Sequence, residues 1–166
     1  MQKALHGENT NHPEIAAVHQ KLAETYEKQG KLTDALNSHK LCLGILQKVY
    51  ELEPNHQSIA TCYTNIGHVL SKEKKHDEAL HYYETSLEMM KVVYAGNPNH
   101  PHIALGCRNI GVTYKIVGQL AKAKENLVSA LKMFQGAYGK DNEQVARTRD
   151  ILEDLQKEIN IQTSTS

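Results

Sequence analysis

The chain has 166 residues, and its 19 lysines and arginines are balanced by 19 aspartates and glutamates. A chain without net charge has no bulk field to hold a nucleic-acid backbone or an anionic membrane, so we expect neither as a partner. No apolar run approaches the length that spans a bilayer. Together with three cysteines that lack CxxC spacing, these features predict a soluble, cytoplasmic protein.

A period of 44 residues runs along the chain. The stretch NHPEIA at residues 11–16 returns as NHQSIA at 55–60 and as NHPHIA at 99–104. Such a period is typical of stacked units, each of which is too small to bury its apolar face alone. The histidine of each copy directly precedes an expected helix, and we therefore assign it to the turn rather than to a metal site.

The first unit predicts two amphipathic helices, at about residues 14–29 and 33–51. Apolar residues at three- and four-residue steps predict one buried face on the first helix: Ile15, Val18, Leu22, Ala23 and Tyr26. Gly30 and Gly118 suit the left-handed backbone that ends a helix, and Lys74 occupies that position in the second unit. Small residues are expected where the two helices of each unit cross: Ala23, Gly67 and Gly111 against Ala35, Ala79 and Ala123.

These residues carry a resemblance to a known family. The pattern Leu22-Ala23-x-x-Tyr26, followed by Gly30 and Ala35, resembles the tetratricopeptide repeat. The period is longer than the family's common value of about 34, and with the HPxIA and AYGKDNEQVA stretches it is similar to the kinesin light chain and nephrocystin type. The resemblance implies an all-α fold, a right-handed α-solenoid of antiparallel helix pairs.

The repeat divides the chain into six segments. We expect residues 1–11 to be the tail of a preceding repeat helix with its connector, and residues 142–159 to form a capping helix followed by a disordered tail at 160–166. The three repeats between them should occupy residues 12–55, 56–99 and 100–141.

The sequence offers little for catalysis or metal binding. His76 and His81 are five residues apart, which places them on different faces of a helix, whereas a pair of helical ligands needs a spacing of three or four. No Gly-rich phosphate loop and no nucleophile with a base at a related position are present. We therefore predict no enzymatic activity, no metal and no cofactor.

The first helices of stacked pairs line the concave surface of such arrays. Asparagine is a poor helix former, but Asn65 and Asn109 offer a donor and an acceptor suited to an extended peptide backbone. In peptide-binding members of the family, an asparagine directly before the Leu-Ala position holds the ligand main chain; these two residues match it, and Lys21 does not. The full set of predicted peptide-binding residues is Asn65, Asn109, Lys21, Arg108, His68, Lys72 and Lys115.

These residues favour a protein–protein interaction module, an adaptor or scaffold that binds a short, extended peptide. Arg108, Lys72 and Lys115 add positive charge, so the expected peptide is acidic. The alternative is a structural or autoregulatory array that packs against another domain or associates with itself and binds no free peptide. In that case the chain would be a monomer or associate weakly through its N-terminal end, where Ala4 and Leu5 leave apolar surface.

Overall fold

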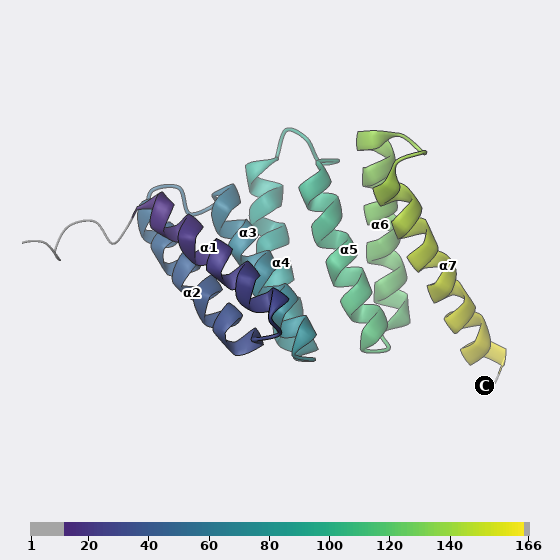
Figure 1. The fold of residues 1–166 in the computed structure, drawn as a ribbon. Helices are drawn as coiled ribbons and strands as arrows, with labels where there is room; N and C mark the ends of the chain where they lie inside the picture. Colours follow the sequence, from purple (N-terminus) through teal and green to yellow (C-terminus); the bar gives the residue numbers. More distant parts are fainter. Residues whose placement is uncertain (1–11, 165–166) are drawn as a thin grey trace, which may run out of the picture.

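The protein is a row of antiparallel helix pairs, which confirms the predicted all-α helical solenoid (Figure 1). The computed structural model describes residues 12–164, and this part of the chain contains helices and no strand. The elements are α1 (Pro13–Lys28), α2 (Leu32–Val49), α3 (Gln57–Lys72), α4 (His76–Val93), α5 (Pro101–Ile116), α6 (Leu120–Tyr138) and α7 (Glu143–Ser164). None of these helices is long and apolar enough to cross a membrane. Each pair packs against the next, and α7 packs against α6.

The repeated histidine begins the first helix of each pair. The Nδ1 atoms of His12, His56 and His100 accept a hydrogen bond from the backbone N–H two residues later, at 3.2–3.3 Å. The rings of His56 and His100 also stack on Tyr50 and Tyr94, with ring centroids 3.6 and 3.5 Å apart. Each of these tyrosines ends the second helix of the preceding pair. The predicted turn role of the histidine is therefore confirmed.

The first helix of each pair ends in the left-handed conformation that the sequence predicts. Gly30 and Gly118 have φ of 73° and 79°, and Lys74 has φ of 62° at the same position of the second pair. Glycine adopts this backbone without a steric penalty, whereas lysine brings its Cβ close to the following carbonyl oxygen. The turn geometry is thus kept at the cost of local strain in the second pair.

The two helices of a pair approach closely where the small residues lie. A Cβ atom added to Gly111 would lie 2.8 Å from Cγ of Leu127 and 3.2 Å from the carbonyl oxygen of Ala123. A Cβ atom added to Gly67 would lie 2.7 Å from the ring of Tyr83. Glycine is therefore required at these crossings because the facing side chain already fills the space.

Two residues of the predicted buried face on α1 are exposed, which corrects that prediction. Val18 is 62% exposed and Leu22 is 38% exposed, whereas their counterparts Cys62 and Ile66 are buried on α3. The reason is that α2 packs against α3, while no described helix precedes α1. The segment 1–11, predicted to be the tail of a preceding repeat helix, lies outside the described residues.

The last helix covers the end of the array and is longer than the sequence suggested. Leu155 of α7 is fully buried in a cluster with Ala123 and Leu127 of α6. The tail predicted to be disordered from residue 160 is helical as far as Ser164, which corrects that prediction for residues 160–164. The hydroxyls of Thr163 and Ser164 both donate to the carbonyl oxygen of Asn160, so side-chain hydrogen bonds support the last turn of the helix.

Candidate functional site: a groove between the first helices

A groove of about 170 Å³ lies between α3 and α5, with α4 as its floor. Its walls are formed by Thr61, Thr64, Asn65 and His68 of α3 and by His102, Leu105 and Gly106 of α5, and its floor by Ser86, Leu87 and Met90 of α4. The hydroxyls of Thr64 and Ser86 lie 2.8 Å apart, and Ser86 also donates to the carbonyl oxygen of Ala60 at 2.7 Å. The groove therefore combines apolar side chains, Leu87, Met90 and Leu105, with polar ones, as binding sites commonly do.

Asn65 lies in the wall of this groove and is half-buried. Among residues 12–164, none makes a hydrogen bond to its side-chain amide. The register of the repeat explains its position, because the packed Ile66 follows it directly and turns Asn65 toward the groove. The amide is thus free to offer a donor and an acceptor to a bound chain.

Asn109 comes from α5 and is already held by His68 of α3. Its Nδ2 lies 3.2 Å from Nε2 of His68. Because an amide nitrogen can only donate, this bond requires an unprotonated Nε2 on the histidine. Burial lowers the pKa of His68, which favours the neutral ring that the bond needs. The contact joins the second and third helix pairs and fixes the direction of the Asn109 amide.

Two of the predicted cationic residues are neutralised by carboxylates. Nζ of Lys72 lies 2.6 Å from Glu27 on α1, and Nζ of Lys115 lies 3.0 Å from Glu158 on α7. Glu27 also accepts from Nε2 of the fully buried His39 at 3.1 Å. Burial alone would raise the pKa of the Glu27 carboxyl, but the bonds from Lys72 and His39 outweigh it and lower the pKa. The charge of Lys72 is thus used to join the first and second helix pairs.

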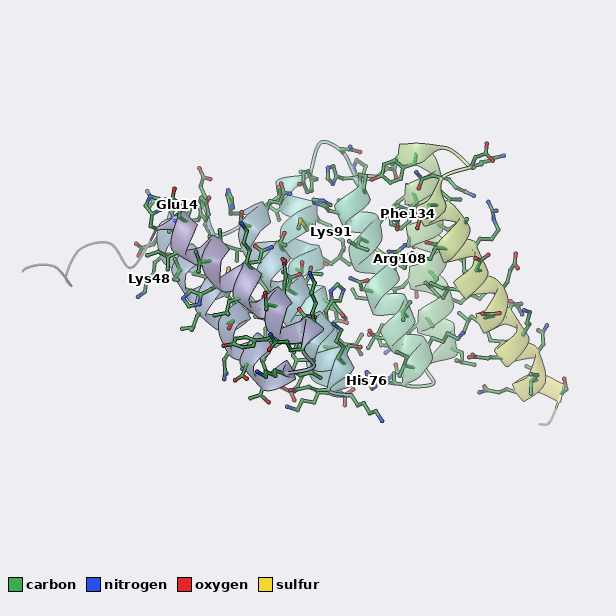
Figure 2. All side chains as sticks on the ribbon, in the orientation of Figure 1. Glu14, Lys48, His76, Lys91, Arg108 and Phe134 are labelled. Atoms are coloured by element: carbon green, nitrogen blue, oxygen red, sulfur yellow. The ribbon has the colours of Figure 1, made fainter. Side chains whose placement is uncertain are left out.

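Within the described residues, the charge of Arg108 is not balanced by a carboxylate, because its hydrogen-bond partner Gln144 is neutral. Its Nη1 donates to Oε1 of Gln144 at 2.6 Å, and its guanidinium lies 5.3 Å from the centre of the Phe134 ring. Arg108 and Phe134 lie on the adjacent helices α5 and α6 (Figure 2). Burial, and then the like charge of Arg147, lower the pKa of Arg108. Two positive side chains are therefore near each other where α5 meets α7, and one of them, Arg147, is paired with Glu143 at 3.2 Å.

The predicted binding residues thus separate into groups. Asn65 and His68 line the groove, and Asn109 is bonded to His68. Lys21 is exposed on α1 and does not line this groove. The binding role of the whole set stays a prediction. Within residues 12–164, no group of three or more histidine, cysteine, aspartate or glutamate residues could hold a metal ion.

Sequence reasoning missed several residues of this site. Thr61 and Leu105 line the groove, each four residues before one of the two asparagines. Their helical spacing was a signal, since residues four apart share a face. The contact between Glu27 and His39 had no such signal, because it joins two helices whose mutual rotation is set by packing.

The comparisons with known proteins identify the repeat. The tetratricopeptide repeat family matches residues 14–91. The comparison with curated protein sequences gave no match. Among solved structures, the chain is similar to BtubC (BKLC) from P. vanneervenii, with a TM-score of 0.78 and 21% identity, covering 93% of this chain and 59% of that one.

Two other solved structures share the fold. A putative kinesin light chain from Podosopora anserina with nearly identical repeats has a TM-score of 0.75 at 17% identity, covering 87% of this chain and 66% of that one. The first tetratricopeptide domain of Spaghetti (RPAP3), bound to the HSP90 peptide SRMEEVD, has a TM-score of 0.64 at 15% identity, covering 90% of this chain and 96% of that one. The chain therefore spans about six tenths of BtubC and nearly all of the Spaghetti domain.

Proposed function

We propose that this chain, in which residues 14–91 match the tetratricopeptide repeat family, is an adaptor or scaffold that holds an extended peptide of a partner protein in the groove between α3 and α5. The observation that carries this proposal is the free amide of Asn65 beside the apolar side chains of the groove. An extended backbone presents alternating donors and acceptors, and a carboxamide can satisfy one of each. The Spaghetti structure holds a peptide, so an array of this fold can do so.

The two asparagines would act differently on the peptide. Asn65 offers its whole amide, whereas Asn109 uses one N–H on His68 and keeps its oxygen and second N–H. Because the bond to His68 already orients the Asn109 amide, less conformational entropy is lost when a peptide binds. We therefore expect Asn109 to fix the register of the peptide, and the side chain of Asn65 to turn toward the peptide and hydrogen-bond to it after binding.

The proposal includes a preference for an acidic peptide. Among residues 12–164, Arg108 has no carboxylate partner, and the like charge of Arg147 acts on it although Arg147 is itself paired with the exposed Glu143. A peptide carboxylate placed between α5 and α7 would relieve this repulsion and gain charge-assisted hydrogen bonds. Lys72 and Lys115 contribute less, because Glu27 and Glu158 already neutralise them. The acidic residue should thus lie toward the C-terminal end of the groove.

The test is a peptide-array screen on the purified chain, followed by affinity measurement of the hits. Changing Asn65 and Asn109 together to Ala removes bonds that contribute about 0.5–1.5 kcal/mol each, so the affinity should fall roughly 5- to 150-fold. Asn37→Ala is the matched control, because Asn37 is exposed on the second helix α2. Unchanged affinity of the double variant, with helicity intact, would refute the proposal.

A separate experiment tests the charge preference. Arg108→Gln keeps a hydrogen-bonding side chain and removes the charge. The affinity for acidic peptides should therefore fall, whereas the affinity for their neutral amide analogues should not. Lys21→Gln is the comparison, since Lys21 is exposed on α1 away from the groove. Equal losses for acidic and neutral peptides would show that Arg108 acts through packing on Phe134 alone.

A second function is favoured by the exposed apolar residues of α1. Val18 and Leu22 are uncovered, while the equivalent residues of α3 are buried under α2. We propose, as the alternative, that this end of the array packs on another domain or on a second copy. Light scattering over a concentration range distinguishes the cases, because a mass that stays that of a monomer argues against self-association. That the chain has no catalytic activity, metal or cofactor, and that it is cytoplasmic, remain predictions.

A further inference from the structure

Two buried thiols meet where the first helix pair packs on the second. Cys42 of α2 and Cys62 of α3 have their Sγ atoms 3.3 Å apart, and each residue is 1% exposed. The contact is not a requirement of the repeat. At the next junction the equivalent residues are Ser86 on α4 and Gly106 on α5, which cannot form such a pair. The thiol pair therefore belongs to one junction of the array.

We propose that Cys42 and Cys62 form an oxidation site, at which a hydroperoxide or a small-molecule disulfide converts the two thiols into a disulfide between the first and second helix pairs. A disulfide needs a sulfur separation of about 2.0 Å, so the two sulfurs must approach by roughly 1.3 Å. Side-chain rotation together with a small shift of α2 against α3 can supply that movement, because the sulfurs already face each other.

The chemistry balances with hydrogen peroxide as the two-electron oxidant. The thiolate of one cysteine attacks a peroxide oxygen and breaks the O–O bond, which gives a sulfenic acid and, after proton uptake, water. The second thiol attacks the sulfenic sulfur, forms the S–S bond and expels hydroxide, which takes the thiol proton to give a second water. The protein loses two protons and two electrons, and the peroxide is reduced to two waters. With a small-molecule disulfide as oxidant, the first thiolate displaces one of its thiolates to give a mixed disulfide, and the second protein thiol displaces the other, so that two small thiols are released.

The environments of the two sulfurs suggest an order for these steps. The hydrogen bond from Cys62 lowers the pKa of Cys42, while the same contact, with burial, raises the pKa of Cys62. The lowered pKa favours Cys42 as the attacking thiolate, but the same disulfide forms when the roles of the two sulfurs are exchanged, because either thiol can donate to the other. Both are buried, so the oxidant must enter when α2 and α3 separate briefly, and the reaction rate should follow that opening.

Cys107 provides a control within the same chain. It is buried on α5, and within residues 12–164 no other thiol lies close enough to contact it. Burial raises its pKa, so it should react slowly. An oxidation that reflects general damage would reach Cys107 as well, whereas a disulfide at the junction would leave it as a thiol.

The experiment treats the purified, folded chain with hydrogen peroxide or with oxidised glutathione and counts thiols after denaturation. We expect the three thiols of the sequence to fall to one, with the mass lowered by two hydrogen atoms. Peptide mapping without reductant should show a fragment that joins Cys42 to Cys62. The disulfide should also raise Tm by about 5–10 °C, an effect that a reductant reverses.

Matched variants separate the site from the fold. Cys107→Ala should leave the reaction unchanged, whereas Cys42→Ala and Cys62→Ala should abolish the loss of mass while keeping helicity. Alanine is tolerated at the first position, since Ala130 occupies it in the third pair and is buried there. Three thiols remaining after oxidation, adducts on single cysteines, or bridges between chains through Cys107 would each overturn the proposal. The mapping of the unmutated chain decides the matter if a variant fails to fold.

Discussion

Glu27 of α1 contacts both α2 within the first helix pair and α3 of the second pair. Its carboxylate accepts from Nε2 of His39 at 3.1 Å and from Nζ of Lys72 at 2.6 Å. His39 is fully buried, so Glu27→Ala leaves a buried donor without a partner at a cost of about 1–3 kcal/mol. The exposed Lys72 adds only about 0.2–1 kcal/mol. We expect a total loss of about 1–4 kcal/mol, or roughly 3–15 °C in Tm.

The assay is thermal and urea unfolding of Glu27→Ala beside Glu24→Ala, which removes an exposed carboxylate from the same helix. The control should stay within about 0.5 kcal/mol of the parent, because Glu24 only accepts a hydrogen bond from the nearby Gln20. Equal unfolding curves for the two variants would refute the assigned role of Glu27.

The same residue predicts a pH dependence. The folded-state pKa of Glu27 lies below the ordinary value of 4.5, so the unfolded chain takes up the proton first as the pH falls. Its contribution is therefore complete above about pH 5 and is lost as the pH drops through the folded-state pKa. Glu27→Gln keeps an acceptor for His39 but has no proton to bind. The stability difference between parent and Glu27→Gln should narrow in acid, and a constant difference would contradict this linkage.

Three further predictions concern single positions. Gly111→Ala should destabilise by about 2 kcal/mol in urea unfolding because its Cβ would meet Leu127, whereas Gly44→Ala, with open space around it in α2, should stabilise by about 0.5–1 kcal/mol. Lys74→Gly should gain about 0.5–1 kcal/mol in the same assay by relieving its positive φ. Burial holds the pKa of His68 below 6.5, so the protonated ring is disfavoured in the folded state and stability should fall as the pH drops below that value. His68→Gln should reduce this fall, measured by urea unfolding between pH 7 and about pH 5.

The fold could be predicted from the sequence because the repeat presents the same evidence three times. His12, His56 and His100 mark the helix starts, and the small residues mark the crossings. Periodicity within one unit could not show which apolar residues lie under a neighbouring pair. Val18 and Leu22 therefore fitted the buried pattern although nothing described covers them.

The residues that face the groove could be predicted from the sequence, but the partners of its charged residues could not. The position of Asn65 beside a packed residue follows from helical spacing. The partners of Lys72 and Lys115 do not, because each comes from a helix whose rotation is set by many packing contacts. The expectation that Lys72 and Lys115 add positive charge did not include their ion pairs with Glu27 and Glu158.

Stacked rings of tyrosine and histidine hold the first two connectors between helix pairs. Tyr50 with His56, and Tyr94 with His100, join the end of one pair to the start of the next. The last joint is built differently: Tyr138 stacks on Phe134 of its own helix, and Asn142 caps α7. The first two connectors are therefore each held by a ring stack between helix pairs, whereas the last one relies on the Asn142 cap of α7.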